Sequence, residues 1–289
     1  MDLELARTFL AVRDAGNFVA AADRLHVTQS TVSTRIGSLE SILGARLFER
    51  GRGGARLTAA GHRFSRHAKM LMRTMEQARH EVGLPAGYEG SLTLGGRIAL
   101  WEGLLPRWIH WLREQAPRVS VRMEIGFEQD LMDSLIQGTM DIATMYTPQH
   151  RPGLRVEHLF DESLVLVTSD VGTPWPDPGY VYIDWGPEFH AQHREAYPAM
   201  EQPGLVANIG WLGIGHILAY GGSGYFPSRI TQDLVAAGRL QRVPGSPVFR
   251  LPTYAVYHTV DAEPYFRTAL EGLRRLALEE REKAPPAGA

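Results

Sequence analysis

Apolar residues recur at helical spacing in two adjacent segments near the start of the chain, and this pattern predicts two helices joined by a tight turn. The first helix follows Asn17, a favourable N-cap residue. Its apolar face consists of Phe18, Ala21, Ala22 and Leu25. The second helix follows Thr28, whose hydroxyl can accept an amide proton of the first turn. Its apolar stripe repeats at steps of four, three and four residues and consists of Val32, Ile36, Leu39 and Leu43. The two segments predict a helix-turn-helix.

The polar face of the second helix carries the side chains that would meet DNA. This face is short, and its groups can both donate and accept hydrogen bonds, as base edges in a major groove require. Its members are Gln29, Ser30, Ser33 and Thr34, with Arg35 at the edge. The pattern therefore indicates a recognition helix.

A glycine-rich basic turn follows the predicted helix-turn-helix. Gly44 tolerates positive φ and is expected to end the recognition helix. The turn spans residues 50–56 and carries three arginines, Arg50, Arg52 and Arg56. Between short extended segments, such a turn is typical of the wing of a winged helix, whose arginines would contact phosphates or enter a minor groove. A solvated basic hairpin is the alternative interpretation.

The order of these motifs resembles the DNA-binding domain of LysR-type transcriptional regulators. The resemblance covers residues 3–61 and rests on the segments GNFVAAADRLHVTQSTVSTRIGSLE, LFERGRGG and RLTAAG. The family often has Pro where Thr31 stands and commonly has Ser where Asn17 stands, and both changes keep the local chemistry. The resemblance implies double-stranded DNA as a partner. The residues that it implies on the DNA are Gln29, Ser30, Thr31, Ser33, Thr34 and Arg35, with Arg50 and Arg52 on the wing.

Charge is distributed unevenly along the chain, which supports polyanion contact at one end only. Residues 1–80 hold thirteen Arg and Lys against seven Asp and Glu, whereas the remainder holds seventeen against twenty-five. The formal net charge of −2 therefore hides a basic N-terminal part and an acidic C-terminal part. The chain contains no cysteine, which excludes disulfides, thiolate metal sites and cysteine nucleophiles.

Length and the remaining composition predict two or three domains and no membrane segment. A chain of 289 residues with this apolar content can build more than one core. The N-terminus lacks an apolar signal region, and the longest apolar stretch, near 205–220, is too short for a bilayer. We therefore expect a cytoplasmic location and no membrane partner.

A long helix is predicted from residue 59, because no proline occurs until Pro85. Its apolar residues alternate at steps of four and three and form a heptad seam of Phe64, Ala68, Leu71, Met75, Ala78 and Val82. The seam would expose apolar area without a partner, so residues 61–90 are predicted to form a dimerisation helix and a hinge. Aligning two DNA half-sites needs a dimer, so we expect self-association as a dimer or a dimer of dimers. The alternative is an amphipathic helix packed on its own domain.

After the hinge the pattern changes to alternating strands and helices, which indicates an α/β domain with a parallel sheet. Strands are expected at 91–95, 119–125 and 141–146, and helices at 104–115 and 131–137. The segments LLPRWIHWLREQAPRVSVRMEIG and LMDSLIQGTMDIATMY resemble the first lobe of the LysR effector domain. The resemblance implies the two-lobed fold of type II periplasmic binding proteins.

The implied organisation is a winged helix-turn-helix at 1–60, the dimerisation helix and hinge at 61–90, and an effector domain at 91–281. Lobe I would cover about 91–165 and 253–281, and lobe II about 166–252. Residues 160–168 would form the strand that crosses from lobe I to lobe II. Lobe II would contain the segments 180–183, 209–220 and 224–226. Residues 254–258 and a helix from 264 to about 280 would return to lobe I. The tail at 282–289 is expected to be disordered.

Two lobes joined by crossing strands create a cleft, and ligands of such sheets lie at strand C-termini and helix N-termini. Arg97 follows the first strand and would suit a carboxylate or another anion. The tryptophans at 101, 185 and 211 would close an aromatic box. The candidate effector-binding residues are Arg97, Ile98, Ala99, Trp101, Phe127, Tyr146, Asp184, Trp185, Trp211 and Tyr225. For each of them core packing is the alternative.

Other chemistry has weaker support in the sequence. His190 and His193 lie near Asp184 with the spacing of metal ligands, but solvated or structural histidines are more common, and we expect no metal and no cofactor. No nucleophile can be paired with a base, so we expect no enzyme activity. We predict an effector-responsive, sequence-specific transcription regulator that binds promoter DNA, a small metabolite and RNA polymerase. The alternative is an enzyme or solute-binding module with an appended DNA-binding domain.

Overall fold

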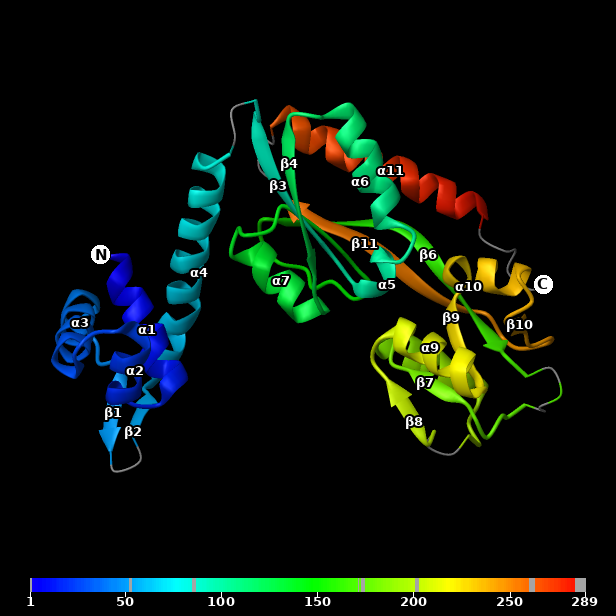
Figure 1. Ribbon diagram of the computed structural model, residues 1–289, viewed down its shortest axis with the longest axis horizontal. Helices are drawn as coiled ribbons and strands as arrows, with labels where there is room; N and C mark the ends of the chain where they lie inside the picture. The colour runs from blue at the N-terminus through cyan, green and yellow to red at the C-terminus, as the bar shows by residue number, and fades with distance from the viewer. Residues whose placement is uncertain are drawn as a thin grey trace. The chain divides into compact units, whose positions relative to one another are not determined.

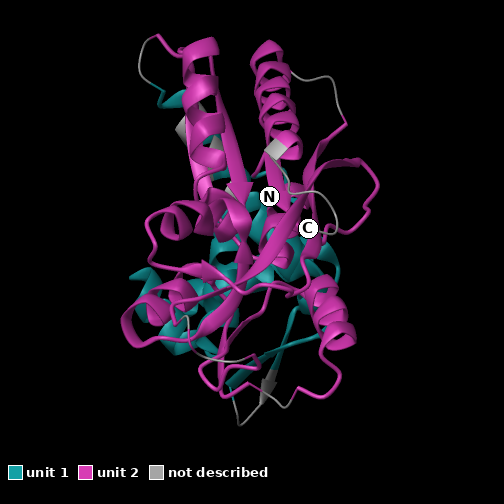
Figure 2. Cartoon of the chain, turned by 90° about the vertical axis from the view of Figure 1, so that its right-hand side faces the viewer, with its two compact units in different colours: residues 1–86, 137–139 teal, residues 87–136, 140–289 magenta. Residues whose placement is uncertain are grey.

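The computed structural model of the chain describes residues 2–51, 54–84, 87–170, 172, 175–200, 203–259 and 263–283. The chain forms two compact units, which Figure 2 shows in different colours. One unit comprises residues 1–86 with 137–139, and the other comprises 87–136 with 140–289. None of the described helices has both the length and the apolar run that crossing a bilayer would require.

Three helices form the N-terminal unit's recognition module: α1 (Leu3–Ala15), α2 (Phe18–Leu25) and α3 (Gln29–Leu43). Both predicted N-caps are confirmed. The Asn17 side chain accepts from the Ala20 amide at 2.7 Å, and the Thr28 hydroxyl accepts from the Thr31 amide at 3.2 Å. These caps satisfy amides that have no partner within the helix, so they fix where α2 and α3 begin.

The predicted apolar stripes pack with α1 into one core, whose buried members include Phe9, Val12, Ala21, Ala22, Val32, Ile36 and Leu39. Leu43 was expected to complete the stripe but is exposed. It is the last helical residue, and Gly44 turns the chain away directly after it with a φ of 65°. The predicted wing follows as two antiparallel strands, β1 (Phe48–Gly51) and β2 (Gly54–Leu57).

The long helix α4 (Ala59–Val82) begins at the Thr58 cap, whose hydroxyl accepts from the Gly61 amide at 3.0 Å. Its seam divides into two halves. Phe64 and Ala68 are buried in the core of the DNA-binding unit, and Leu71 packs against that core. These three therefore follow the alternative interpretation of a helix packed on its own domain. Met75 is half-buried, Ala78 is exposed, and Val82 is 88% exposed.

The second unit is organised around one mixed sheet with the strand order β10-β6-β11-β5-β3-β4. Strands β3 (Gly90–Gly96), β4 (Val119–Ile125) and β5 (Ile142–Met145) are parallel, as the alternating pattern predicts. The long strands β6 (Leu154–Thr168) and β11 (Phe249–His258) are antiparallel to each other. Both begin earlier than expected. The first residues of β6 pair with the last residues of β11, and β11 begins opposite Leu164 of β6, without a clear alternation in the sequence.

Helices cover both faces of this sheet (Figure 1). One face carries α6 (Leu105–Gln115) and α11 (Pro264–Lys283), which pack against each other, with the short helix α5 (Ile98–Trp101) preceding α6. The Trp108 indole donates to the Ala269 carbonyl at 2.8 Å between them. The other face carries α7 (Glu128–Ile136) over Ala143 and Met145. Helix α11 extends through Lys283, two residues into the expected disordered tail, and 284–289 lie outside the described residues.

The pairing of β6 with β11 contains one irregularity. Thr253 lies opposite Phe160 and Tyr254 lies opposite His158, so Leu159 has no residue opposite it. The chain therefore forms a β-bulge at Leu159. The Leu159 carbonyl accepts a hydrogen bond from Nε of Arg281 on α11 at 2.5 Å.

The second lobe is a smaller layer attached to the far half of β6. It contains the parallel pair β7 (Val181–Ile183) and β8 (Leu205–Ala207), with strand β9 (Ser223–Pro227) on β6 and the short β10 (Gln241–Arg242). Its helices are α8 (Pro187–Ala196), α9 (Gly210–Tyr220) and α10 (Ser228–Ala236). Helices α8 and α10 were not predicted.

Candidate DNA-binding and effector-binding sites

The recognition helix α3 presents its predicted polar face at its first turns. Gln29, Ser30 and Thr34 are exposed, whereas Thr31 and Ser33 are half-buried. The Thr28 hydroxyl lies 2.8 Å from the hydroxyls of both Ser30 and Thr31. The start of the helix therefore carries a linked group of hydroxyls beside an exposed Gln29, a surface able to donate to and accept from base edges.

Arg35 has an internal partner that the sequence did not reveal. Its Nη1 lies 3.1 Å from Oε2 of Glu4 and 3.4 Å from the Thr8 hydroxyl, and its side chain is 27% exposed. The guanidinium therefore ties α3 to α1 while leaving an edge open to solvent. A carboxylate in the first turn of α1 is the one sequence signal that pointed to this pairing.

The wing is anchored to the end of α1 by its backbone. The Ala55 amide donates to the Gly16 carbonyl at 2.7 Å. Gly54 has a φ of 102°, and a Cβ added there would lie 2.4 Å from the same carbonyl oxygen, so only glycine fits this approach. Arg50 lies on β1 opposite Ala55, while its side chain and the whole of Arg52 lie outside the described residues.

Arg97 follows β3 at the N-cap position of α5, and its guanidinium is a buried cation. The side chain is only 7% exposed, with Nε 3.3 Å from Oε1 of Glu128 and Cζ 4.7 Å from the centre of the half-exposed Phe127 ring. Nε is buried and forms no hydrogen bond among the described residues. A buried guanidinium donor without a hydrogen-bond partner is costly, so this site has unused capacity for an anion.

The other predicted cleft residues separate into core and surface. Trp185 and Tyr225 are core residues of the second lobe, and the Trp185 indole donates to the Tyr225 carbonyl at 2.8 Å. The Trp101 indole donates to the Glu124 carbonyl at 3.1 Å, and Trp211 is 52% exposed. Trp185 packs against Gly210 inside its own lobe, which matches the core-packing alternative.

Four further candidates have local roles in the structure. Ile98 is half-buried, and Ala99 is buried. Asp184 is exposed and accepts from the Gly186 amide at 3.0 Å. Tyr146 is buried and donates its hydroxyl to Oε2 of Glu162 at 2.9 Å. Burial raises the pKa of Tyr146 well above its usual value, and the neighbouring Glu162 raises it further, so its hydroxyl stays protonated.

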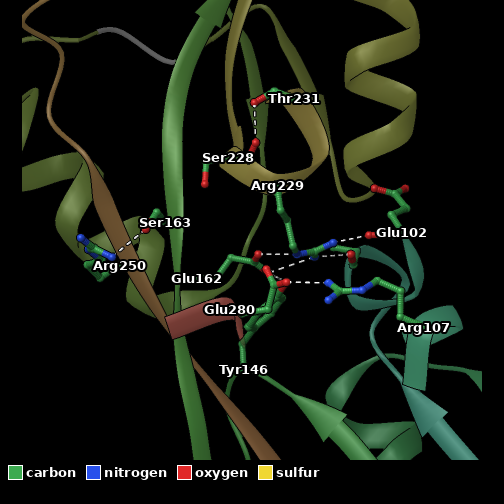
Figure 3. Close-up of polar contacts among 11 residues, drawn as sticks. Glu102, Arg107, Tyr146, Glu162, Ser163, Ser228, Arg229, Thr231, Arg250 and Glu280 are labelled. Atoms are coloured by element: carbon green, nitrogen blue, oxygen red, sulfur yellow. Dashed lines mark hydrogen bonds and ion pairs between the residues drawn. The ribbon is translucent and has the colours of Figure 1, made fainter. Parts of the chain in front are cut away.

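Sequence reasoning missed the buried network around Arg229 (Figure 3). Nε of Arg229 lies 2.6 Å from Oε1 of Glu162, and Nη2 lies 3.1 Å from Oε2. The same guanidinium donates to the carbonyl of Ala99 at 2.5 Å and to that of Glu102. Burial would lower the pKa of Arg229, but the charge and hydrogen bonds of Glu162 outweigh it and raise that pKa. Arg229 thus joins α10 to the crossing strand β6 and to the backbone directly after Arg97.

A cavity of about 440 Å³ opens beside this network, and its walls carry more acidic than basic side chains. Arg107 on the wall forms ion pairs with Glu279 and, at 2.7 Å, with Glu280. Glu102 places both carboxylate oxygens in the interior without a hydrogen-bond partner among the described residues. Burial raises the pKa of Glu102 above its usual value, because the charged form loses its solvation there.

His190 and His193, the pair with the spacing of metal ligands, form hydrogen bonds with other side chains of the second lobe. Nε2 of His190 accepts from Nη2 of Arg194 at 3.0 Å, and Nε2 of His193 lies 2.9 Å from the Tyr180 hydroxyl. Among the described residues, no three side chains of metal-ligating type gather. The pair therefore takes part in a hydrogen-bonded aromatic cluster of the second lobe.

Comparisons with known proteins agree with the two-part architecture. The model of the lysR-family bacterial regulatory helix-turn-helix protein matches residues 3–62, and that of the LysR substrate binding domain matches residues 85–277. The HTH-type transcriptional regulator HdfR of Yersinia pestis is 31% identical over 269 residues, covering 89% of this chain and 90% of HdfR.

Solved structures share the fold along almost the whole chain. Full-length CbnR complexed with its target DNA has a TM-score of 0.66 at 21% identity, covering 96% of this chain and 100% of CbnR. LysG from Corynebacterium glutamicum with bound effector Arg has a TM-score of 0.55 at 18% identity, covering 96% and 99%. At these identities, the solved structures show only that the fold is shared. The family models and HdfR show that the chain belongs to the LysR family of transcriptional regulators.

Proposed function

We propose that this regulator binds promoter DNA through paired winged helices and responds to a small anionic metabolite held by Arg97. Family membership makes it a DNA-binding transcription regulator with an effector-binding domain. The observation that carries the finer proposal is the Arg97 guanidinium, which is 7% exposed and whose buried Nε forms no hydrogen bond among the described residues.

An anionic ligand complements the positive charge and hydrogen-bond donors of Arg97 better than a neutral ligand does. The Arg97–Glu128 contact is at Nε, and a guanidinium fork can donate two parallel hydrogen bonds to a carboxylate. A carboxylate would accept both bonds, and a charge-assisted contact of this kind contributes about 1.5–3 kcal/mol. The half-exposed Phe127 ring beside the guanidinium offers apolar surface for the rest of such a ligand.

DNA binding and assembly follow from the N-terminal unit. CbnR has been captured on its target DNA and LysG with an effector, which supports the same two partners here. Met75, Ala78 and Val82 remain outside the core of the unit and are proposed to meet a second copy of α4. Pairing two recognition helices suits a two-fold operator. We further propose that the chain acts by binding alone, with RNA polymerase as the downstream partner.

The test is a thermal-shift screen of small carboxylates and other metabolites on the full chain, followed by footprinting with each ligand that stabilises it. Arg97→Ala is expected to weaken effector binding roughly ten- to a hundredfold while basal DNA binding persists. Arg113→Ala, which removes an exposed arginine of α6, is the matched control. Equal effector affinity in wild type and Arg97→Ala would refute the Arg97 proposal, and metabolite turnover would favour the enzymatic alternative.

A further inference from the structure

The second lobe contains a cavity of about 580 Å³ that is separate from Arg97 and from the Arg229 network. All its lining residues lie between positions 182 and 206, so it is formed by β7, β8, α8 and the chain that follows α8. Its volume lies in the range of small-molecule sites. Nothing described so far, including the proposed anion site, uses this cavity.

His193 forms part of the cavity wall and is 6% exposed. Its Nε2 lies 2.9 Å from the hydroxyl of the buried Tyr180, and the two rings stack with their centroids 5.7 Å apart. The Tyr180 hydroxyl has no other partner among the described residues, so its proton is satisfied by donation to Nε2. The proton of the neutral imidazole then resides on Nδ1.

Nδ1 of His193 is therefore a donor without a partner among the described residues. Because His193 lines the cavity, a molecule bound there would be the acceptor for this N–H. Burial, assisted by the nearby His190, lowers the pKa of His193 to about 4, which keeps the imidazole neutral at ordinary pH. The cavity wall thus has one fixed, neutral donor.

Two side chains of opposite charge, Asp184 and Arg194, line the cavity. Burial raises the pKa of Tyr182, Asp184 raises it further, and Arg194 lowers it, so both charged groups act on this hydroxyl. Asp184 uses one oxygen on the Gly186 amide, and Arg194 uses Nη2 on His190. Among the described residues of the cavity lining, Asp184 and Arg194 are the two that are charged when the histidines are neutral.

The remaining wall is apolar or aromatic. It includes Tyr197, Met200 and Val206, together with Pro198 and Pro203. The Tyr197 ring lies 5.2 Å from the His193 ring, so the aromatic surface is continuous with the buried donor. A ligand with only a positive charge would be repelled by Arg194, and a ligand with only a negative charge would be repelled by Asp184. A ligand that carries both charges therefore matches the cavity better.

We propose that this cavity binds a zwitterionic amino acid with an apolar side chain. Its carboxylate accepts from Arg194 and from Nδ1–H of His193, and its ammonium group donates to Asp184. Its side chain packs against Tyr197, Met200 and Val206. The site makes the second lobe responsive to a ligand of different chemistry from the anion proposed at Arg97.

Isothermal titration of the full-length protein with L-phenylalanine, L-methionine and L-leucine tests the proposal. At least one of these is expected to bind saturably, one molecule per chain. The analogues 3-phenylpropionate, which lacks the ammonium group, and 2-phenylethylamine, which lacks the carboxylate, are expected to bind about ten- to a hundredfold more weakly.

Variants locate the binding in the cavity. Arg194→Gln and Asp184→Asn alter exposed side chains and are expected to weaken amino-acid binding about tenfold or more. Arg239→Gln, at an exposed position outside the cavity, and Arg97→Ala are expected to leave it unchanged. No binding up to roughly 10 mM, equal binding by 3-phenylpropionate, or unchanged binding in both cavity variants would overturn the proposal. The proposal would also be overturned if amino-acid binding were lost in Arg97→Ala but kept in the cavity variants. If Arg97→Ala weakens only the binding of the anionic effector, that result bears on the proposed function and not on this cavity.

Discussion

Replacing Arg35 by Ala separates a role in DNA reading from a role in holding α3 on α1. The guanidinium has one ion pair, 3.1 Å from Glu4, and one hydrogen bond, 3.4 Å from Thr8. The side chains of the ion pair are 27% and 43% exposed. Pairs of this exposure stabilise a protein by about 0.2–1 kcal/mol. The truncation opens no core cavity, because the buried stripe of α3 consists of Val32, Ile36 and Leu39.

The expected loss in operator binding is larger than the expected loss in stability. A good base contact contributes about 1–3 kcal/mol, so losing it weakens specific binding roughly five- to 150-fold. The stability loss predicts a fall of only a few degrees in Tm, about 4–8 °C per kcal/mol for a unit of this size. Glu4→Gln keeps the shape of the partner but releases the ion pair, so it is expected to change base preference rather than abolish binding.

Fluorescence anisotropy with operator and unrelated duplexes at one fixed salt concentration measures both effects. Arg63→Ala removes the same charge from an exposed position of α4 and serves as the control for general electrostatics. Arg35→Ala should lose affinity for the operator but change little toward the unrelated duplex. If Arg35→Ala and wild type bind the operator equally, Arg35 serves only to tie the two helices together.

Three further predictions concern the rest of the chain. Met75→Asp should dissociate the oligomer in sedimentation and weaken operator binding, whereas an unchanged oligomer would place the interface elsewhere. Arg229→Met leaves the buried Glu162 unpaired and should lower the free energy of unfolding by about 3–5 kcal/mol, and adding Glu162→Gln should recover much of it in denaturant titrations. Glu102→Gln should raise Tm at pH 7, because the folded pKa of Glu102 is raised and its charged form is disfavoured; the gain should vanish as pH falls below 4.5. A gain that persists at low pH would contradict this linkage.

Local signals in the sequence predicted local structure well. The caps at Asn17 and Thr28 act within three residues, and the periodic stripes they introduce became buried faces. The seam of α4 shows where this reasoning ends. A stripe indicates which side of a helix avoids water, but Phe64 and Met75 belong to the same stripe while only Phe64 is buried in its own unit. Periodicity alone does not say what covers it.

The candidate site was predictable only where topology placed a residue at the end of a strand. Arg97 follows β3, and its position and burial fit the chemistry proposed from the sequence. Arg229 and Glu162 are 67 residues apart, and their contact depends on how the second lobe folds back onto β6. Trp185 was placed in the cleft by the same strand-end rule, but its large apolar ring favours the interior.

The β-bulge at Leu159 has a mechanical consequence. Strands β6 and β11 are shared by both lobes, so a rotation of one lobe against the other is a torsion of this two-stranded ribbon. A β-bulge disrupts the ladder locally and bends the strand, so we expect such a rotation to concentrate near Leu159. Arg281 of α11 donates a hydrogen bond to the Leu159 carbonyl, so α11 restrains the backbone at the bulge. A contact from α11 is thereby expected to limit motion at a point more than a hundred residues upstream.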